Sequence, residues 1–70
     1  MTGKVKTVKS RGFGFIETSL GIDFFFHQSE FQGNFKDLLN EVAKGTHPEV
    51  IFEQDSDSKQ GPRAIKVTLV

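Results

Sequence analysis

The stretch Arg11-Gly12-Phe13-Gly14-Phe15-Ile16 decides how the rest of the 70-residue chain is interpreted. In a β-strand, successive side chains point to opposite faces. Phe13 and Phe15 therefore share one face, and Ile16 lies on the other. The two glycines are expected to leave the surface beside the rings unobstructed, and Arg11 places a cation at its edge. The stretch predicts a strand with one aromatic face and one face that can enter a core.

Two rings and a cation on a flat strand suit a ligand made of unpaired bases and phosphates. Aromatic faces stack on any base, and arginine or lysine binds the phosphate backbone. The stretch also matches the first five positions of an aromatic RNA-binding signature, K/R-G-F/Y-G/A-F. The alternative is a hairpin strand whose phenylalanines are simply buried.

Length and composition indicate a single domain over residues 1–70 with a small hydrophobic core. The chain has no cysteine, which excludes a disulfide framework and a thiolate metal site. No apolar run approaches transmembrane length, and the N-terminus lacks the apolar segment of a secretion signal. We therefore predict a cytoplasmic protein that makes no membrane contact and is a monomer.

The net charge is zero, but the charges are unevenly distributed along the chain. Residues 1–11 and 59–70 carry basic side chains and no acidic ones, whereas 12–58 hold all nine acidic residues and only two lysines. If the fold brings the two ends together, a basic patch forms on a neutral protein. The alternative is that these lysines and arginines are ordinary solvated positions on strand faces.

Alternating polar and apolar residues predict five short strands, at 3–8, 13–19, 23–27, 49–54 and 64–70. In the last strand, Ile65, Val67 and Leu69 are expected to share one face. The link between the third and fourth strands is expected to hold two short helical turns, near 29–31 and 36–41. Gly33-Asn34 interrupts the helical pattern between them. The segment 55–61 is polar and is expected to be mobile.

A strand would explain the cluster Phe24-Phe25-Phe26-His27, because alternate side chains of a strand point to opposite faces. Phe24 and Phe26 would then point into the core, while Phe25 and His27 would point outward. If this strand lies beside 13–19, the outer pair extends the first two rings into one surface. We call this surface, formed by Phe13, Phe15, Phe25 and His27, the aromatic platform. The alternative is that Phe25 is also core and that His27 only caps a strand end.

Five short strands with a longer irregular link after the third describe a small closed antiparallel sheet. Closure removes exposed strand edges, which would otherwise pair with other chains. The sequence therefore predicts an all-β fold, the five-stranded OB barrel, which binds oligonucleotides on the face of its second and third strands.

Four blocks of the sequence together resemble a bacterial cold-shock domain, in the order and near the spacing of that family. They are Gly3-Lys4-Val5-Lys6, Arg11 to Ile16, Asp23 to Ser29, and Gly61-Pro62-Arg63-Ala64. The resemblance covers essentially the whole chain. It implies an OB barrel that binds single-stranded RNA or DNA and acts as an RNA chaperone or as a regulator of transcription or translation.

The resemblance also implies roles for individual residues. The expected stacking residues are Phe13, Phe15, Phe25, His27 and Phe35. The residues that it implies for phosphate contacts are Lys4, Lys6 and Arg11. Beyond the resemblance, we expect Lys59 and Arg63 to help set the path of the phosphate backbone, and Gln28 and Asp23 are candidates for hydrogen bonds to the edges of bases.

The sequence departs from the family at three positions that usually carry aromatic side chains. Thr7 replaces a tryptophan, Val8 replaces an aromatic residue in the first strand, and Gln28 replaces the aromatic that often follows the histidine. The connection between the first two strands is one residue shorter, and the link 40–48 is longer. Each base–aromatic stack is worth ~1–3 kcal/mol, so we expect weaker binding over fewer nucleotides.

Other function classes fit the sequence less well. An RRM needs two full helices and the reverse order of its two motifs. A dinucleotide site would require glycine where Glu17 stands. Asp23 and His27 lie too far apart along one strand face to form a catalytic pair, and His27 with His47 alone makes no metal site. We therefore predict no enzyme activity, no cofactor, no metal and no small-molecule substrate.

The main alternative is a barrel of the same kind that binds protein rather than nucleic acid. Zero net charge, the missing tryptophan and the acidic middle of the chain favour this reading. The four side chains of the aromatic platform disfavour it, because exposed aromatic clusters in so small a protein are explained by a ligand.

Overall fold

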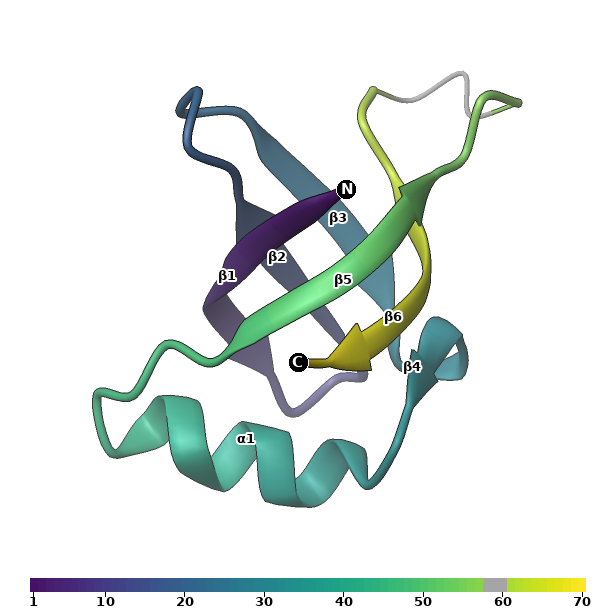
Figure 1. Ribbon diagram of the computed structural model, residues 1–70. Helices are drawn as coiled ribbons and strands as arrows, with labels where there is room; N and C mark the ends of the chain where they lie inside the picture. Colours follow the sequence, from purple (N-terminus) through teal and green to yellow (C-terminus); the bar gives the residue numbers. More distant parts are fainter. Residues whose placement is uncertain (58–60) are drawn as a thin grey trace.

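A computed structural model of the chain describes residues 1–57 and 61–70. Figure 1 shows its strands curled around one another, with the helix labelled α1 below them. The elements in order are β1 (Thr2–Lys9), β2 (Phe13–Glu17), β3 (Asp23–His27), the 3-10 turn η1 (Gln28–Glu30), β4 (Phe31–Gln32), α1 (Phe35–Ala43), β5 (Glu49–Gln54) and β6 (Ala64–Leu69). No helix in this described part of the chain is long and apolar enough to cross a membrane.

The strands form one sheet in the order β3-β2-β1-β5-β6-β4. Neighbouring strands are antiparallel except for β4, which runs parallel to β6. A bridge between Phe25 and Arg63 brings β3 against the start of β6, on the side of β3 that β2 leaves unpaired. This contact curls the sheet into a barrel, and the predicted all-β OB fold is confirmed.

The core lies inside the barrel and follows the predicted alternation in β2, β3 and β5. Phe24 and Phe26 are 3% and 0% exposed, whereas Phe25 between them is half-buried on the outer face. In β5, Val50 and Phe52 point inward and Ile51 points outward. The buried apolar residues are Val5, Val8, Ile16, Phe24, Phe26, Phe31, Leu38, Val50, Phe52, Ala64 and Val67.

The helix α1 is longer than the single turn predicted near 36–41. The side chain of Asn34, which the sequence pattern suggested as an interruption, caps the helix and accepts hydrogen bonds from the backbone N–H groups of Lys36 and Asp37. Asparagine is among the preferred N-cap residues because it satisfies N–H groups that lack helical partners. The helix lies across one end of the barrel (Figure 1), and its residue Leu38 is buried. The longer link before β5 is explained by this extra helix length.

Three strand predictions need correction. β2 ends at Glu17, because Thr18 begins a turn in which its N–H donates to the carbonyl of Ile22. β4, two residues long, was not predicted, and it buries Phe31 beside Val67. The third correction concerns β6.

The expected alternation in β6 is broken. Leu69 is 49% exposed, and the buried members are Ala64 and Val67. Lys66 has a φ of 53°, and the register against β5 shifts between Ile51 and Glu53. An irregularity of this kind inserts a residue and turns the following side chains to the other face.

The two glycines of the first motif have different structural roles. A Cβ on Gly14 would lie 2.7 Å from the carbonyl oxygen of Thr7 and 2.8 Å from the ring of Phe26. Gly12 has a φ of 103° and is covered by the side chain of Gln28. Gly14 therefore requires glycine for close packing and Gly12 for its positive φ, which corrects the expectation that they keep the surface beside the rings open.

Candidate nucleic-acid interface

Pairing of β2 with β3 brings the predicted rings together. Phe15 is opposite Phe25, and Phe13 is opposite His27. The ring centres of Phe13 and Phe25 are 5.6 Å apart with planes inclined by 27°, and Phe15 meets both edge-on at 6.1 and 5.8 Å. All three rings are half-buried, so each packs against its neighbours and still exposes part of its surface. The arrangement provides a contiguous apolar area on which flat groups can stack.

His27 lies at the end of the platform and is exposed. Its Nδ1 accepts a hydrogen bond from the backbone N–H of Ser29 at 3.1 Å and lies 2.8 Å from the Ser29 hydroxyl. The ring thereby caps η1, and the register of β2 and β3 places His27 opposite Phe13. Because Nδ1 accepts from a backbone N–H, the proton of the neutral ring must sit on Nε2.

We expect the two histidines to be opposite tautomers when neutral. His47 Nδ1 lies 3.0 Å from the carbonyl oxygen of Val5, which can only accept, so in His47 the proton sits on Nδ1. Long-range proton–nitrogen correlation spectra, recorded at a pH where both rings are neutral, should show an Nε2–H form for His27 and an Nδ1–H form for His47. An Nδ1–H form for His27 would contradict the contact with Ser29.

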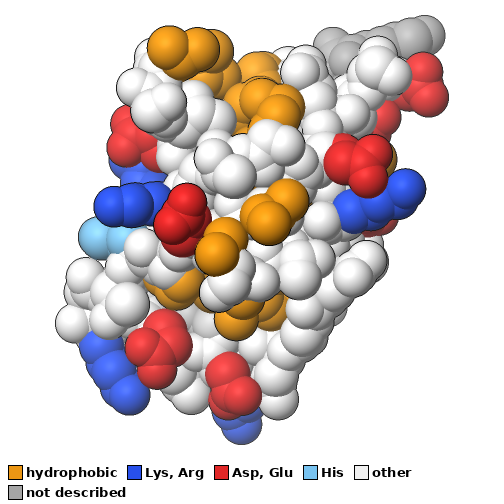
Figure 2. Space-filling model, in the orientation of Figure 1, with side chains coloured by type: hydrophobic (Ala, Val, Ile, Leu, Met, Phe, Trp, Pro, Cys, Tyr) orange, Lys and Arg blue, Asp and Glu red, His pale blue; other side chains and the backbone are white. Residues whose placement is uncertain are grey.

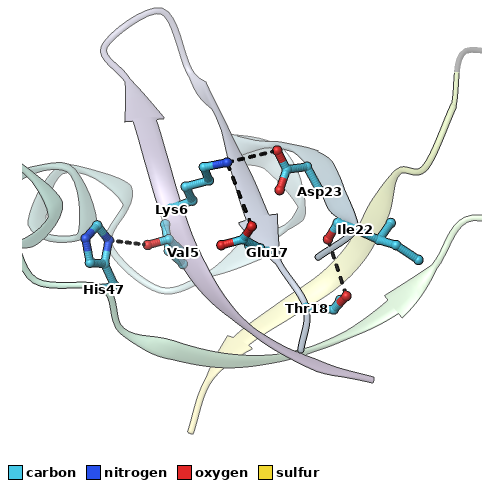
Figure 3. A network of polar contacts seen from close by, with 7 residues as sticks. All are labelled: Val5, Lys6, Glu17, Thr18, Ile22, Asp23 and His47. Atoms are coloured by element: carbon cyan, nitrogen blue, oxygen red, sulfur yellow. Dashed lines mark hydrogen bonds and ion pairs between the residues drawn. The ribbon is translucent and has the colours of Figure 1, made fainter. Parts of the chain in front are cut away.

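Two of the predicted phosphate-binding lysines lie among carboxylates. Lys6 Nζ is 3.3 Å from Asp23 and 3.9 Å from Glu17, as Figure 3 shows. Lys4 is paired in register with Glu17 on one side and Glu49 on the other. Exposed ion pairs contribute only ~0–1 kcal/mol, so Lys6 can be released, but a phosphate must compete for it. Asp23, predicted to touch a base edge, is the partner that holds Lys6.

Unlike Lys6, the cations beside Phe13 and Phe25 are not held by carboxylates of the described residues. Within the residues described, Lys9, Arg11 and Arg63 form no ion pair. Lys9, Ser10, Arg11 and Phe13 line a shallow hollow beside the platform. Sequence reasoning counted Lys9 in the charge of the first strand but did not include it in the site, because only the turn after β1 brings it beside Phe13. Lys59, also predicted to meet phosphate, lies outside the described residues.

The face seen in Figure 2 has a different character. Acidic and basic side chains are scattered over it, with separate apolar groups between them. Ile51, on the outer face of β5, is 50% exposed. This mixture of signs does not form a continuous basic surface.

The three departures from the family pattern have different structural consequences. Thr7 is half-buried and pairs with Phe15, so it lies beside the platform with a side chain too small to stack. Val8 is 9% exposed and belongs to the core, which corrects the interpretation that it costs the platform a ring. A register shift between Val5 and Thr7 turns Val8 inward. Gln28 lies over Gly12 at the edge of the site.

Phe35, the fifth predicted stacking residue, is not part of the platform. It begins α1, and its ring meets Phe26 at 6.3 Å and Phe31 at 6.4 Å. It packs against the core because α1 closes the end of the barrel rather than extending over the face of β2 and β3.

The comparisons with known proteins agree with this fold. The family model described as the 'Cold-shock' DNA-binding domain matches residues 1–70. The cold shock-like protein CspD of Bacillus cereus is 44% identical over 68 residues, covering 96% of this chain and 94% of the relative. The cold shock-like protein CspE of Bacillus anthracis is 43% identical over 68 residues, covering 96% and 92%. The chain therefore belongs to the cold-shock domain family, a family of nucleic-acid-binding domains.

Proposed function

We propose that the protein binds single-stranded RNA or DNA by stacking bases on the aromatic platform. The observation that carries this proposal is the cluster of Phe13, Phe15 and Phe25, three partly exposed rings within 6.1 Å of one another on adjoining strands. Stacking of this kind tolerates any base, because every base has a π-face. Duplexes are excluded because paired bases hide those faces inside the helix.

The strand's phosphates face solvent and meet cations at the edge of the platform. Arg11 and Lys9 stand at one end, beside Phe13. Lys6 is neutralised in part by its ion pairs with Glu17 and Asp23, and Lys4 lies in register between Glu17 and Glu49. Gln28, next to Gly12, is placed where it can hydrogen-bond a base edge.

Such binding gives RNA chaperoning without an energy source. A protein that binds only the open strand shifts the melting equilibrium of a hairpin toward the open form, by as much as its preference for that form allows. A regulatory role in transcription or translation follows from the same shift, if the hairpin that is opened controls either process.

Titration of labelled oligonucleotides tests the proposal. Heptamers of thymidine and of uridine, and a mixed hexamer, are compared with a duplex of the same length at two salt concentrations. We expect dissociation constants on the order of micromolar for the single strands and much weaker binding of the duplex. Thymidine against uridine also reports whether the 2′-hydroxyl contributes. A folded protein that binds no single strand below about a millimolar would overturn the proposal and favour a protein-interaction module.

The salt dependence of binding should be shallow, because few cations are available. Each phosphate contact to a single strand contributes a slope of about 0.7 in log K against log salt, so three contacts give about 2. Arg11→Gln should lower this slope by about 0.7. Lys36→Gln, a change of equal charge on the exposed side of α1, should leave it unaltered. An unchanged slope in Arg11→Gln would remove Arg11 from the phosphate path.

A further inference from the structure

Arg63 is held beside the aromatic platform by its backbone. It forms the bridge that joins β6 to Phe25. The N–H of Phe25 donates to the carbonyl of Pro62 at 3.0 Å, and the N–H of Asp55 donates to the carbonyl of Arg63 at 2.8 Å. The main chain around Arg63 is therefore fixed from two sides. Its side chain starts from a defined point on the flank of β3 that lies away from β2.

The guanidinium of Arg63 lies against Phe25. Its Cζ is 5.9 Å from the centre of the Phe25 ring, within the range of a cation–π contact. Since β2 and β6 contact β3 on opposite sides, Phe25 is flanked by Phe13 on one side and by Arg63 on the other. The platform therefore ends in a planar cation, and guanidinium planes stack on bases as aromatic rings do.

The Nε and the terminal nitrogens of the Arg63 guanidinium differ in how accessible they are to solvent. Within the described residues, Nε is the one side-chain polar atom that is both buried and without a hydrogen-bond partner. The terminal nitrogens Nη1 and Nη2 are not buried in this way, and neither bonds to a described residue. The Nη1–Nη2 edge is therefore the part of Arg63 that a ligand can reach.

The position of this edge relative to the platform rings favours a base over a phosphate as its ligand. With Nε buried and the guanidinium against Phe25, Arg63 lies at the level of the rings, where stacked bases lie. Phosphates lie on the solvent side of stacked bases, and Lys9 and Arg11, the residues proposed to meet them, are exposed. A pair of parallel N–H groups binds best to two adjacent acceptors. Guanine offers O6 and N7, and cytosine offers O2 and N3, whereas adenine, uracil and thymine have no two adjacent acceptors.

We propose that Arg63 is a specificity-determining residue of the platform, whose Nη1–Nη2 edge binds two adjacent acceptors on one base, O6 and N7 of guanine or O2 and N3 of cytosine. The inference rests on the proposed single-strand binding and adds a base preference to it. Bidentate contacts of arginine to guanine discriminate between bases by ~5- to 150-fold. For a half-exposed guanidinium we expect about tenfold.

The test uses uridine heptamers that carry one central guanosine, 7-deazaguanosine, cytidine or adenosine, beside the unsubstituted heptamer. The wild-type protein should bind the guanosine or the cytidine heptamer about tenfold more tightly than the uridine and adenosine heptamers. If guanine is the ligand, 7-deazaguanosine, which lacks N7, should bind like uridine. If cytosine is the ligand, the cytidine heptamer alone should be preferred.

Arg63→Lys separates base reading from charge, because lysine keeps the positive charge but has no planar pair of donors. It should abolish the preference, so that the ratio between the dissociation constants of the uridine heptamer and of the guanosine or cytidine heptamer falls from about ten to about one. Equal loss for all heptamers in Arg63→Lys, with a fold unchanged by circular dichroism, would show a phosphate contact and overturn the inference. A wild-type protein that binds every heptamer equally would also overturn it and leave the proposed function standing. Failure to bind the uridine heptamer at all would instead be the failure of the proposed function.

Discussion

Replacing Phe15 with alanine should weaken binding of a uridine or thymidine heptamer by about 5- to 150-fold while the barrel stays folded. Phe15 packs edge-on against both other phenylalanines of the platform, at 6.1 and 5.8 Å. Truncation of a stacking residue costs ~1–3 kcal/mol, and each 1.4 kcal/mol is about tenfold in affinity. The loss of its edge contacts should also leave Phe13 and Phe25 less well positioned, so the effect should lie toward the upper end.

The control for this prediction is Ile51→Ala. Ile51 is an apolar side chain of an outer strand face, 50% exposed, and β1 separates its strand from β2. Its truncation removes apolar surface without touching the platform, so affinity should not change. Both variants are measured by the same titration, with circular dichroism to show that each is folded. Unchanged affinity in folded Phe15→Ala would mean that the platform is not the binding surface.

The sequence predicted the platform because a β-strand has a fixed period. Once 13–17 and 23–27 are strands, alternation separates Phe13, Phe15 and Phe25 from Phe24 and Phe26, and pairing of consecutive strands brings the outer rings together. The site depends on two neighbouring strands joined by a short turn. Local pattern was therefore enough to define its central part.

The parts that the sequence did not predict depend on irregularities of closure. Val8 points inward because the β1–β2 register shifts between Val5 and Thr7, and the alternation of β6 breaks at Lys66, which has a φ of 53°. Such shifts add one residue to one strand, and their position is set by how the whole sheet curls. No periodic pattern in the strand itself indicates where the extra residue falls.

The ion pairs of the site also could not be predicted from local sequence pattern. Lys6, Glu17 and Asp23 come from three adjacent strands, and they meet only because β1, β2 and β3 align in register (Figure 3). Along the sequence, a basic first segment is followed by an acidic middle. In the fold, Lys6 of the first segment lies beside Glu17 and Asp23 of the second. The same closure explains Phe35, whose helix caps the barrel instead of lying over the platform.

Replacing Phe26 with alanine should have the largest effect on stability, lowering the free energy of unfolding by about 3–5 kcal/mol. Phe26 is 0% exposed and packs against Phe31 and Phe35 beneath Gly14. Truncation loses the free energy gained by burying the ring, and the cavity that it leaves adds to the cost. At roughly 0.05–0.15 kcal/mol per residue, a chain of this length holds only about 3.5–10 kcal/mol, so the variant loses much or all of its stability.

Phe25→Ala is the matched comparison, because it changes the same residue type one position away on the opposite face. Its half-buried ring contributes contacts with Phe13 and Phe15, so its loss should cost only about 1–2 kcal/mol. Urea unfolding followed by circular dichroism measures both. Phe25→Ala should remain folded and bind oligonucleotides poorly, whereas the binding lost in Phe26→Ala should follow the fraction of protein that is unfolded. Equal destabilisation by the two variants would contradict the division of β3 into a core face and a ligand face, and with it the basis on which the platform was assigned.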